Sequence, residues 1–195
     1  LKRKASFLAR LGSGSACISI EGGLVVWGEH KTILGSSDLE GVPYPFEVHD
    51  VFKNYQDAIL LVDKGEKQVS STVGHNLMHN HPYAPSRFEQ AHRHLDQLIP
   101  ILKSGDLEGF ISIIEKEALT LHAIMMSSDP YFILMKPNTL EIINLLWTYR
   151  KRTKIPVCFT LDAGANVHVL YPKKHAIEVE LLVKNKLSEY CKSKK

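Results

Sequence analysis

Hydrophobic and polar positions alternate with helical spacing through much of the second half of the chain. Over 107–125, apolar residues recur at i, i+3, i+4 and i+7, which predicts a long amphipathic helix with one buried face. The same spacing predicts helices over 85–103, 140–153 and 174–190, with capping residues before several of them. A shorter helical pattern stands near the start of the chain, at 4–11.

Short apolar runs bounded by turn residues predict strands. One strand is expected over 58–63, and a β-hairpin is expected over 156–161 and 166–171. The turn of this hairpin, at 162–164, carries a carboxylate between two apolar runs. Residues 16–29 also indicate β structure, with two glycines marking a bulge or tight turn.

The order of these elements predicts an α+β fold. Strands come first, then helices, then the hairpin and a last helix, so we expect a mostly antiparallel sheet with helices on one face. Residues 30–57 are polar and contain Gly, Pro and Ser, which is typical of a long connection. The chain begins with Leu and enters a helical stretch without a cap, so we expect that an N-terminal part precedes it.

The composition is that of an ordinary globular protein. The chain has 195 residues, 44% hydrophobic and 23% charged, enough for one substantial core. The net charge of +3 lies largely at the two ends, which argues against a nucleic-acid partner. No apolar run approaches the roughly 20 residues of a membrane span. Three dispersed cysteines without a CxxC motif suit a reducing compartment, so we predict a cytoplasmic protein.

A segment rich in Gly and Ser follows the first predicted helix. Ser13, Gly14 and Ser15 could cradle a phosphate, because glycine lets backbone N–H groups approach an anion and hydroxyls add donors. The plainer interpretation is a helix C-terminus followed by a turn. The segment is not a nucleophile elbow, since Ala16 stands where G-x-S-x-G requires its second glycine.

Asp162, in the hairpin turn, is the second candidate. A charge there is costly to leave unpaired, so something must hold it or use it. It is either a turn residue that bonds its own backbone, or a general base or phosphate-site carboxylate. Its neighbours Ala163, Gly164 and Ala165 are small enough to let a substrate approach closely.

Histidines form a third group. His75 and His79 have the i, i+4 spacing of a zinc-binding helix, His81 follows closely, and His92 and His94 form a second close pair. No Glu follows His75 and no cysteine is near, so we expect a solvated helix face and no metal site. The hydroxyls at 70–72 would cap this helix and could also bind an anion.

Three segments, 9–17, 71–74 and 159–166, read ARLGSGSAC, STVG and FTLDAGAN. In order and approximate spacing they resemble the G-S-G-S-A-C-R-S, S-T-x-G and D-A-G-x-N motifs of the diphosphomevalonate decarboxylase family, within the GHMP kinase superfamily. The first and last motifs are specific when they occur together. The resemblance extends along nearly the whole chain.

The resemblance implies an ATP-dependent decarboxylation. ATP phosphorylates the 3-hydroxyl of a mevalonate diphosphate, and phosphate and carbon dioxide then leave to give isopentenyl diphosphate. By the family pattern, Asp162 lies beside that hydroxyl as base or orienting group. The pattern also implies that Ser13, Gly14 and Ser15 contact the substrate phosphates and that Gly164 closes the phosphate site. It further implies a ferredoxin-like sheet covered by helices, and a homodimer of the kind this family often forms.

The chain departs from the family pattern in two ways that bear on its activity. Ile18 replaces an arginine, which removes a bidentate contact to a carboxylate or phosphate. No nucleotide-binding phosphate loop is found, so ATP and Mg²⁺ would bind mainly to an N-terminal half outside this chain. We therefore divide the chain into a remnant of the N-terminal domain, 1–57, and a C-terminal domain, 58–195. The isolated chain is expected to be inactive, with an apolar seam that includes 24–27.

Two other functions stay open. The missing arginine motivates a non-catalytic paralogue that acts in binding or dimerisation, although the intact Asp162, Ser13 and Ser15 count against it. The third hypothesis is a sister kinase or decarboxylase that acts on mevalonate or phosphomevalonate. Such an enzyme needs fewer anion contacts and could dispense with the arginine.

Overall fold

A computed structural model describes residues 1–65, 78 and 80–192. The chain forms two compact units, Leu1–Glu47 and Val48–Lys195. Residues 48–57, which we placed in the first domain, lie in the second unit because the strand that begins at Tyr55 pairs with a C-terminal strand. The origin of the first unit as a remnant of an N-terminal domain stays a prediction.

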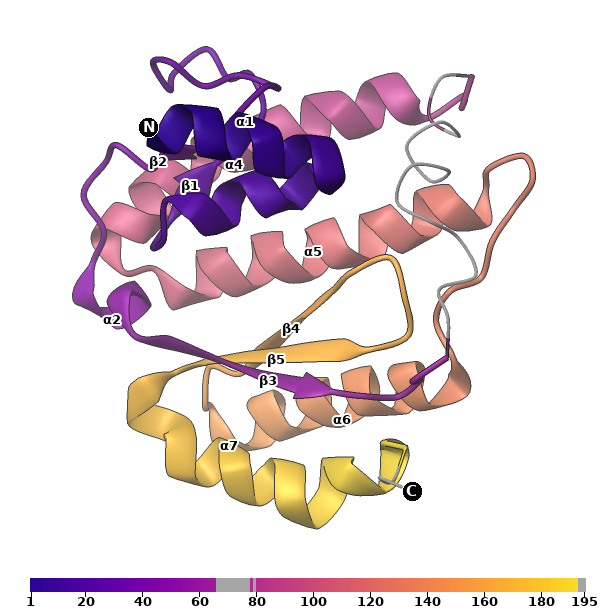
Figure 1. The fold of residues 1–195 in the computed structure, drawn as a ribbon. Helices are drawn as coiled ribbons and strands as arrows, with labels where there is room; N and C mark the ends of the chain where they lie inside the picture. The colour runs from indigo at the N-terminus through magenta and orange to yellow at the C-terminus, as the bar shows by residue number, and fades with distance from the viewer. Residues whose placement is uncertain (66–77, 79, 193–195) are drawn as a thin grey trace. The chain divides into compact units, whose positions relative to one another are not determined.

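The first unit begins with a helix, which confirms the helical pattern near the start of the chain. Short elements follow, and only two of them are strands. The elements are α1 (Lys2–Gly12), a 3₁₀-helix (Gly14–Ile20), and the antiparallel pair β1 (Val25–Val26) and β2 (Val42–Pro43) (Figure 1).

The β structure expected over 16–29 is wrong, apart from the short strand β1. Residues 16–20 instead belong to the 3₁₀-helix, where Ala16 donates its backbone N–H to the carbonyl of Ser13 at 3.0 Å. The coil ends before Gly22 and Gly23, whose φ values of 69° and 64° are unfavourable for extended pairing. Local turn chemistry here outweighs the β propensity of the apolar residues.

A buried serine ties the first unit together. The side chain of Ser6 has no exposed surface, and its Oγ donates to the carbonyl of Cys17 and accepts from the N–H of Gly41, both at 2.9 Å. Arg3 in α1 also forms an ion pair with Glu40. These contacts fix the 3₁₀-helix against α1, and with it the Gly/Ser segment between them.

The second unit combines an antiparallel sheet with long helices. The helices predicted over 85–103, 107–125 and 140–153 are confirmed as α4, α5 and α6. The last predicted helix, over 174–190, forms in pieces, with a π-helical turn (Val183–Leu187) after α7. The elements are α2 (Asp50–Lys53), β3 (Tyr55–Leu60), α4 (Ala84–Ser104), α5 (Leu107–Met126), α6 (Pro137–Thr153), β4 (Cys158–Leu161), β5 (Val167–Pro172) and α7 (Ala176–Leu182).

The strand order in this sheet is β3-β5-β4, and both pairs are antiparallel. Val169 of β5 stands opposite Ala58 of β3 and Phe159 of β4, so these three side chains share one face. The helices α6 and α7 cover that face, while α5 runs beside the edge strand β4 (Figure 1). The α+β class, the antiparallel sheet and the predicted hairpin are therefore confirmed.

The core of the second unit lies between the sheet and the helices α6 and α7. Its centre is made of apolar side chains without exposed surface, which the alternation along β4 and β5 directs toward the helices. These side chains are Phe159, Val167, Val169, Ile142, Leu146 and Val179.

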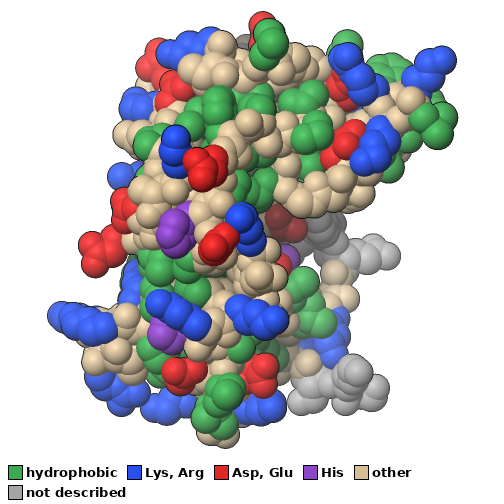
Figure 2. Space-filling model, turned by 90° about the vertical axis from the view of Figure 1, so that its left-hand side faces the viewer, with side chains coloured by type: hydrophobic (Ala, Val, Ile, Leu, Met, Phe, Trp, Pro, Cys, Tyr) green, Lys and Arg blue, Asp and Glu red, His purple; other side chains and the backbone are tan. Residues whose placement is uncertain are grey.

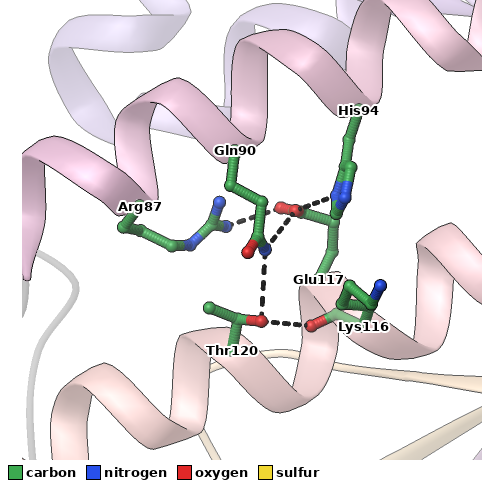
Figure 3. Close-up of polar contacts among 6 residues, drawn as sticks. All are labelled: Arg87, Gln90, His94, Lys116, Glu117 and Thr120. Carbon is green, nitrogen blue, oxygen red and sulfur yellow. Dashed lines mark hydrogen bonds and ion pairs between the residues drawn. The ribbon is translucent and has the colours of Figure 1, made fainter.

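A polar network joins α4 to α5 (Figure 3). Three side chains of α4 donate hydrogen bonds to the Glu117 carboxylate of α5: Arg87 at 2.6 Å, Gln90 at 3.0 Å and His94 at 2.5 Å. Burial alone would raise the pKa of Glu117, but the Gln90 hydrogen bond and the Arg87 charge outweigh it and lower that pKa. Gln90 also donates to Thr120 at 3.2 Å, so several contacts fix α5 against α4.

A second carboxylate, Glu115, joins α5 to α6. Arg150 donates to both Glu115 oxygens, at 2.6 and 3.0 Å, and to the carbonyl of Val157 at 2.7 Å. The indole N–H of Trp147 donates to Glu115 at 2.8 Å. Helix α5 is therefore held by α4 and by α6, which fixes the residues near its C-terminal end.

Charged side chains surround α7. Figure 2 shows lysine and arginine over the part of the second unit that carries this helix, with acidic side chains among them. Lys184 lies 3.8 Å from Glu180, which is one pairing of opposite charges at this surface.

None of the helices formed by the described residues is long and apolar enough to cross a membrane.

Candidate active site

Asp162 lies in the turn that connects β4 to β5, and it is exposed. Its backbone carbonyl accepts hydrogen bonds from Nε2 of His122 at 3.0 Å and from the N–H of Gly164 at 2.7 Å. Among the described residues, no hydrogen bond or ion pair of the Asp162 carboxylate is found. The turn is therefore closed through the backbone of Asp162, and its carboxylate faces outward.

Other parts of the second unit hold the rest of this turn. Thr139, at the start of α6, is fully buried and donates its hydroxyl to the carbonyl of Ala165 at 2.6 Å. The side-chain oxygen of Asn166 accepts from the N–H of Asp63 at 2.9 Å, and Ala163 packs beside Met125. The backbone of the turn is thus anchored from several elements.

His122 anchors the turn from α5, and only 1% of it is exposed. Burial lowers the pKa of His122 and outweighs the hydrogen bond to the Asp162 carbonyl, which favours the charged form. The ring is therefore neutral near pH 7, and Nε2 carries its proton because a carbonyl can only accept.

Gly164 leaves open space beside Asp162. A Cβ added at Gly164 would have no heavy atom within 4 Å, and its φ is not in the left-handed region. Neither packing among the described residues nor backbone conformation requires glycine there. The space beside Gly164 is therefore unoccupied among the described residues, and its role in ligand approach stays a prediction.

The other candidates lie in the first unit. Ser13 has an extended backbone, with φ −154° and ψ 128°, between α1 and the 3₁₀-helix. Ser13 and Ser15 are exposed, and no hydrogen bond of either hydroxyl is found among the described residues. Gly14 begins the 3₁₀-helix. The structure therefore groups Ser13, Gly14 and Ser15 in one unit, and Asp162 and Gly164 in the other.

Ile18 lies on the same 3₁₀-helix as Ser15, and 40% of it is exposed. An exposed isoleucine contributes little to the packing of its own unit. The position is therefore open to a longer polar side chain, such as the arginine of the family motif.

The histidine group is only partly described. The motif at 71–74, His75 and His79 lie outside the described residues. His81 is buried, accepts from the N–H of Tyr83 at 3.1 Å and lies 3.2 Å from the hydroxyl of Ser127. His94 is also buried, against Glu117, so the solvated face expected for these two histidines is wrong. The described residues contain no group of three or more His, Cys, Asp or Glu that could hold a metal ion.

The expected apolar seam at 24–27 is only partly exposed. In this seam, Leu24 and Trp27 are exposed, but Val26 is buried, so at most part of the seam is available to a partner.

His122 was not among the candidate residues of the sequence analysis. The available signal was its place four residues after the apolar Ala118, on the buried side of a strongly periodic helix.

Comparisons with known proteins find relatives of one family. Residues 58–195 match the family described as "Mevalonate 5-diphosphate decarboxylase C-terminal domain". A diphosphomevalonate decarboxylase of Ganoderma lucidum is 30% identical over 187 residues, which cover 92% of this chain and 46% of the relative. A phosphomevalonate decarboxylase of Haloferax volcanii is 26% identical over 95 residues, or 49% of this chain and 29% of the relative.

Solved structures share the fold. A structure of the mevalonate diphosphate decarboxylase from Enterococcus faecalis has a TM-score of 0.82 and 26% identity, over 98% of this chain and 56% of that chain. A structure described as "MDDEF in complex with MVAPP, AMPPCP and Magnesium" has a TM-score of 0.83 and 28% identity, over 98% and 57%.

The fold and these likenesses define an α+β domain of the GHMP kinase type. The chain belongs to the mevalonate 5-diphosphate decarboxylase family, whose C-terminal domain it contains, and the family expected from the three motifs is confirmed. The chain spans about half the length of the curated relatives it matches.

Proposed function

We propose that this chain supplies the C-terminal part of an ATP-dependent decarboxylase that converts mevalonate diphosphate into isopentenyl diphosphate. The observation that carries the proposal is the Asp162 turn, in which the backbone is anchored and the carboxylate faces outward. A carboxylate presented in this way is available to a substrate hydroxyl. A structural neighbour described with MVAPP, AMPPCP and magnesium supports the substrate class.

The proposed chemistry begins at the tertiary hydroxyl of the substrate. Asp162 accepts the proton of that hydroxyl, or orients it, while the oxygen bonds to the γ-phosphorus of ATP and ADP leaves. The carbon–oxygen bond then breaks and phosphate departs. The electrons of the bond to the carboxylate form the new carbon–carbon double bond, and carbon dioxide is released.

The Gly/Ser segment would hold the substrate phosphates. The exposed hydroxyls of Ser13 and Ser15 can donate to phosphate oxygens, and Gly14 lets the backbone approach them. Gly164 would let the substrate come close to Asp162, because no side chain fills the space beside it. Ser13, Gly14, Ser15 and Gly164 would each help to bind or orient the substrate.

ATP and Mg²⁺ are assigned mainly to the family's N-terminal half. The described residues offer no cluster of metal-ligating side chains, so no magnesium ligand is assigned to them. The complex with AMPPCP and magnesium supports the use of both by the family. We also propose that the protein is cytoplasmic, because its three cysteines are free. The resemblance to the family leads us to expect a homodimer.

A second candidate substrate is phosphomevalonate. Ile18 in place of an arginine removes one anion contact, which suits a substrate with one phosphate fewer. The likeness to the phosphomevalonate decarboxylase of Haloferax volcanii covers 49% of this chain and supports the same choice.

The experiment that tests the proposal is a substrate panel on the intact gene product that contains this sequence. ADP release and carbon dioxide release are measured with ATP, Mg²⁺ and, in turn, mevalonate, its monophosphate and its diphosphate. We expect both products with the diphosphate. Preference for the monophosphate would establish the second candidate. No turnover on any substrate, with activity gained in an Ile18→Arg variant, would support the non-catalytic paralogue.

A further inference from the structure

The helix α5 carries one buried polar side chain that reaches the Asp162 turn. His122 is 1% exposed, and its neighbours on the same helix face are apolar, including the buried Ala118 and Met125. A buried imidazole is costly unless its polar atoms are paired, so its partner indicates its role. The hydrogen bond found for it is the one to the Asp162 carbonyl, at 3.0 Å.

We propose that His122 is a positioning residue, which sets the direction of the Asp162 carboxylate by holding the backbone of that residue. The inference rests on the proposed function, in which Asp162 meets the substrate hydroxyl. The hydrogen bond of His122 found among the described residues ends on the Asp162 carbonyl, so His122 would act through Asp162.

The geometry favours this role over simple packing. The bond from His122 ends on the residue proposed for catalysis, whereas Thr139 and Asn166 anchor later parts of the turn. Without His122, the Asp162 carbonyl would keep only the local bond from Gly164, which lies within the turn and moves with it. Among the described residues, the Asp162 carbonyl would then have no hydrogen bond from α5, although Ala163 would still pack against the cluster of Met125 and Leu134.

The supporting helix is itself rigid. Glu117 joins α5 to α4 (Figure 3), and Glu115 joins α5 to α6, so both neighbouring helices hold the helix that carries His122. The buried ring is neutral because its pKa is lowered, and a neutral ring with its proton on Nε2 donates to the carbonyl without placing a charge beside the carboxylate.

The test compares two substitutions at this position in the intact gene product, assayed for ADP release with ATP, Mg²⁺ and mevalonate diphosphate. His122→Leu keeps the apolar bulk and removes the donor. We expect kcat to fall about 10- to 100-fold, since misplacement of a reacting group by about 1 Å has effects of that order, with KM nearly unchanged. His122→Gln keeps an N–H donor of similar reach and should restore most of the kcat.

A double substitution separates positioning from other roles. If His122 acts through Asp162, then His122→Leu should cause no further loss of kcat in an Asp162→Asn background. Multiplicative losses, or His122→Leu with the kcat of the parent, would overturn the inference. If His122→Leu does not fold, as judged by its thermal transition, His122→Asn, whose amide is one methylene shorter, takes its place against His122→Gln.

The outcomes also separate this inference from the proposed function. An Asp162→Asn variant with the kcat of the parent would overturn the proposed function. An inactive Asp162→Asn variant together with a fully active His122→Leu variant would overturn the role of His122 alone.

Discussion

At the scale of single residues, Asp162 uses its two polar groups differently. Its carbonyl closes the turn and accepts from His122, while the carboxylate faces outward. The sequence left two interpretations open, a turn residue or a reactive carboxylate. The structure explains why both could be drawn, because the turn is closed by the backbone and the carboxylate is left for another partner.

Gly164 allows a prediction that separates stability from activity. In a Gly164→Ala variant, the added Cβ would have no heavy atom within 4 Å, so the unfolding free energy should change by less than about 0.5 kcal/mol. The same methyl group would stand where the substrate approaches, so KM should rise and kcat/KM should fall. Steady-state kinetics with urea unfolding would check both.

Gly41 provides the matched control for this substitution. A Cβ there would lie 2.8 Å from Cγ1 of Val25 and 3.2 Å from the carbonyl of Cys17, so Gly41→Ala should destabilise the protein by about 1–3 kcal/mol. If Gly164→Ala binds substrate as the parent does, Gly164 has no role in ligand approach.

The site residues that the sequence could supply are those with a distinctive local pattern. Ser13, Gly14, Ser15, Asp162 and Gly164 stand in two short motifs whose composition indicates turns and anion contacts. Those motifs contain no information about which distant side chain would anchor the turn. Contacts such as the one from His122 span 40 positions in sequence and depend on tertiary packing.

At the scale of elements, α5 is the scaffold of the site. Its apolar periodicity made it the clearest helix in the sequence, and the structure places it over Leu107–Met126. Two carboxylates, the buried Glu115 and the half-buried Glu117, hold it between α4 and α6. The helix that donates to the Asp162 carbonyl is therefore held in place by polar contacts in its middle part.

The Glu117 network leads to a prediction about stability and pH. The pKa of Glu117 is lowered in the folded protein, so its carboxylate stabilises the fold above the unfolded pKa of about 4.3 and loses that contribution as pH falls through the folded value. A Glu117→Gln variant should be less stable at pH 7 by about 1–3 kcal/mol, and the difference should shrink as the pH falls from the unfolded pKa through the lowered pKa of the folded state.

Urea unfolding of parent and variant from pH 7 to about pH 3 measures this difference. Glu141→Gln, at an exposed position of α6, is the control and should behave as the parent throughout. A destabilisation by Glu117→Gln that stays constant down to pH 3 would contradict the account of the network.

Elements were predictable where one pattern dominates and were missed where patterns compete. The long helices and the hairpin follow from apolar periodicity and a clear turn, and the structure confirms them. The stretch 16–29 is rich in β-forming residues, but its first residues, 16–20, form a 3₁₀-helix between Ser13 and the two glycines at 22 and 23. Over so short a segment, the β propensity of the side chains is outweighed by the backbone hydrogen bonds and turns at its ends.

At the scale of the whole molecule, the candidate residues belong to two units. Ser13, Gly14 and Ser15 lie in Leu1–Glu47, and Asp162 and Gly164 lie in Val48–Lys195. The chain also spans about half the length of its curated relatives and carries no recognisable nucleotide phosphate loop. The proposed activity therefore depends on more than the residues in this chain.

This dependence predicts the behaviour of the 195-residue chain alone. With ATP, Mg²⁺ and mevalonate diphosphate, the chain should release no ADP above background, because no ATP site is assigned to it. A cooperative thermal transition of the same sample would show that the chain is folded. Substrate-dependent ADP release by the chain alone would contradict the assignment of the ATP site to the family's N-terminal half.

The central claim is that the Asp162 carboxylate acts on the substrate hydroxyl, and its most direct test is the kcat of an Asp162→Asn variant of the intact gene product. The amide keeps the shape of the side chain and the backbone bonds of the turn, but it cannot accept the proton. We predict a fall in kcat of about 10²- to 10⁴-fold with an unchanged thermal transition, while Asp129→Asn, at another exposed aspartate, keeps the parent value. A kcat within a few-fold of the parent for Asp162→Asn would contradict the account.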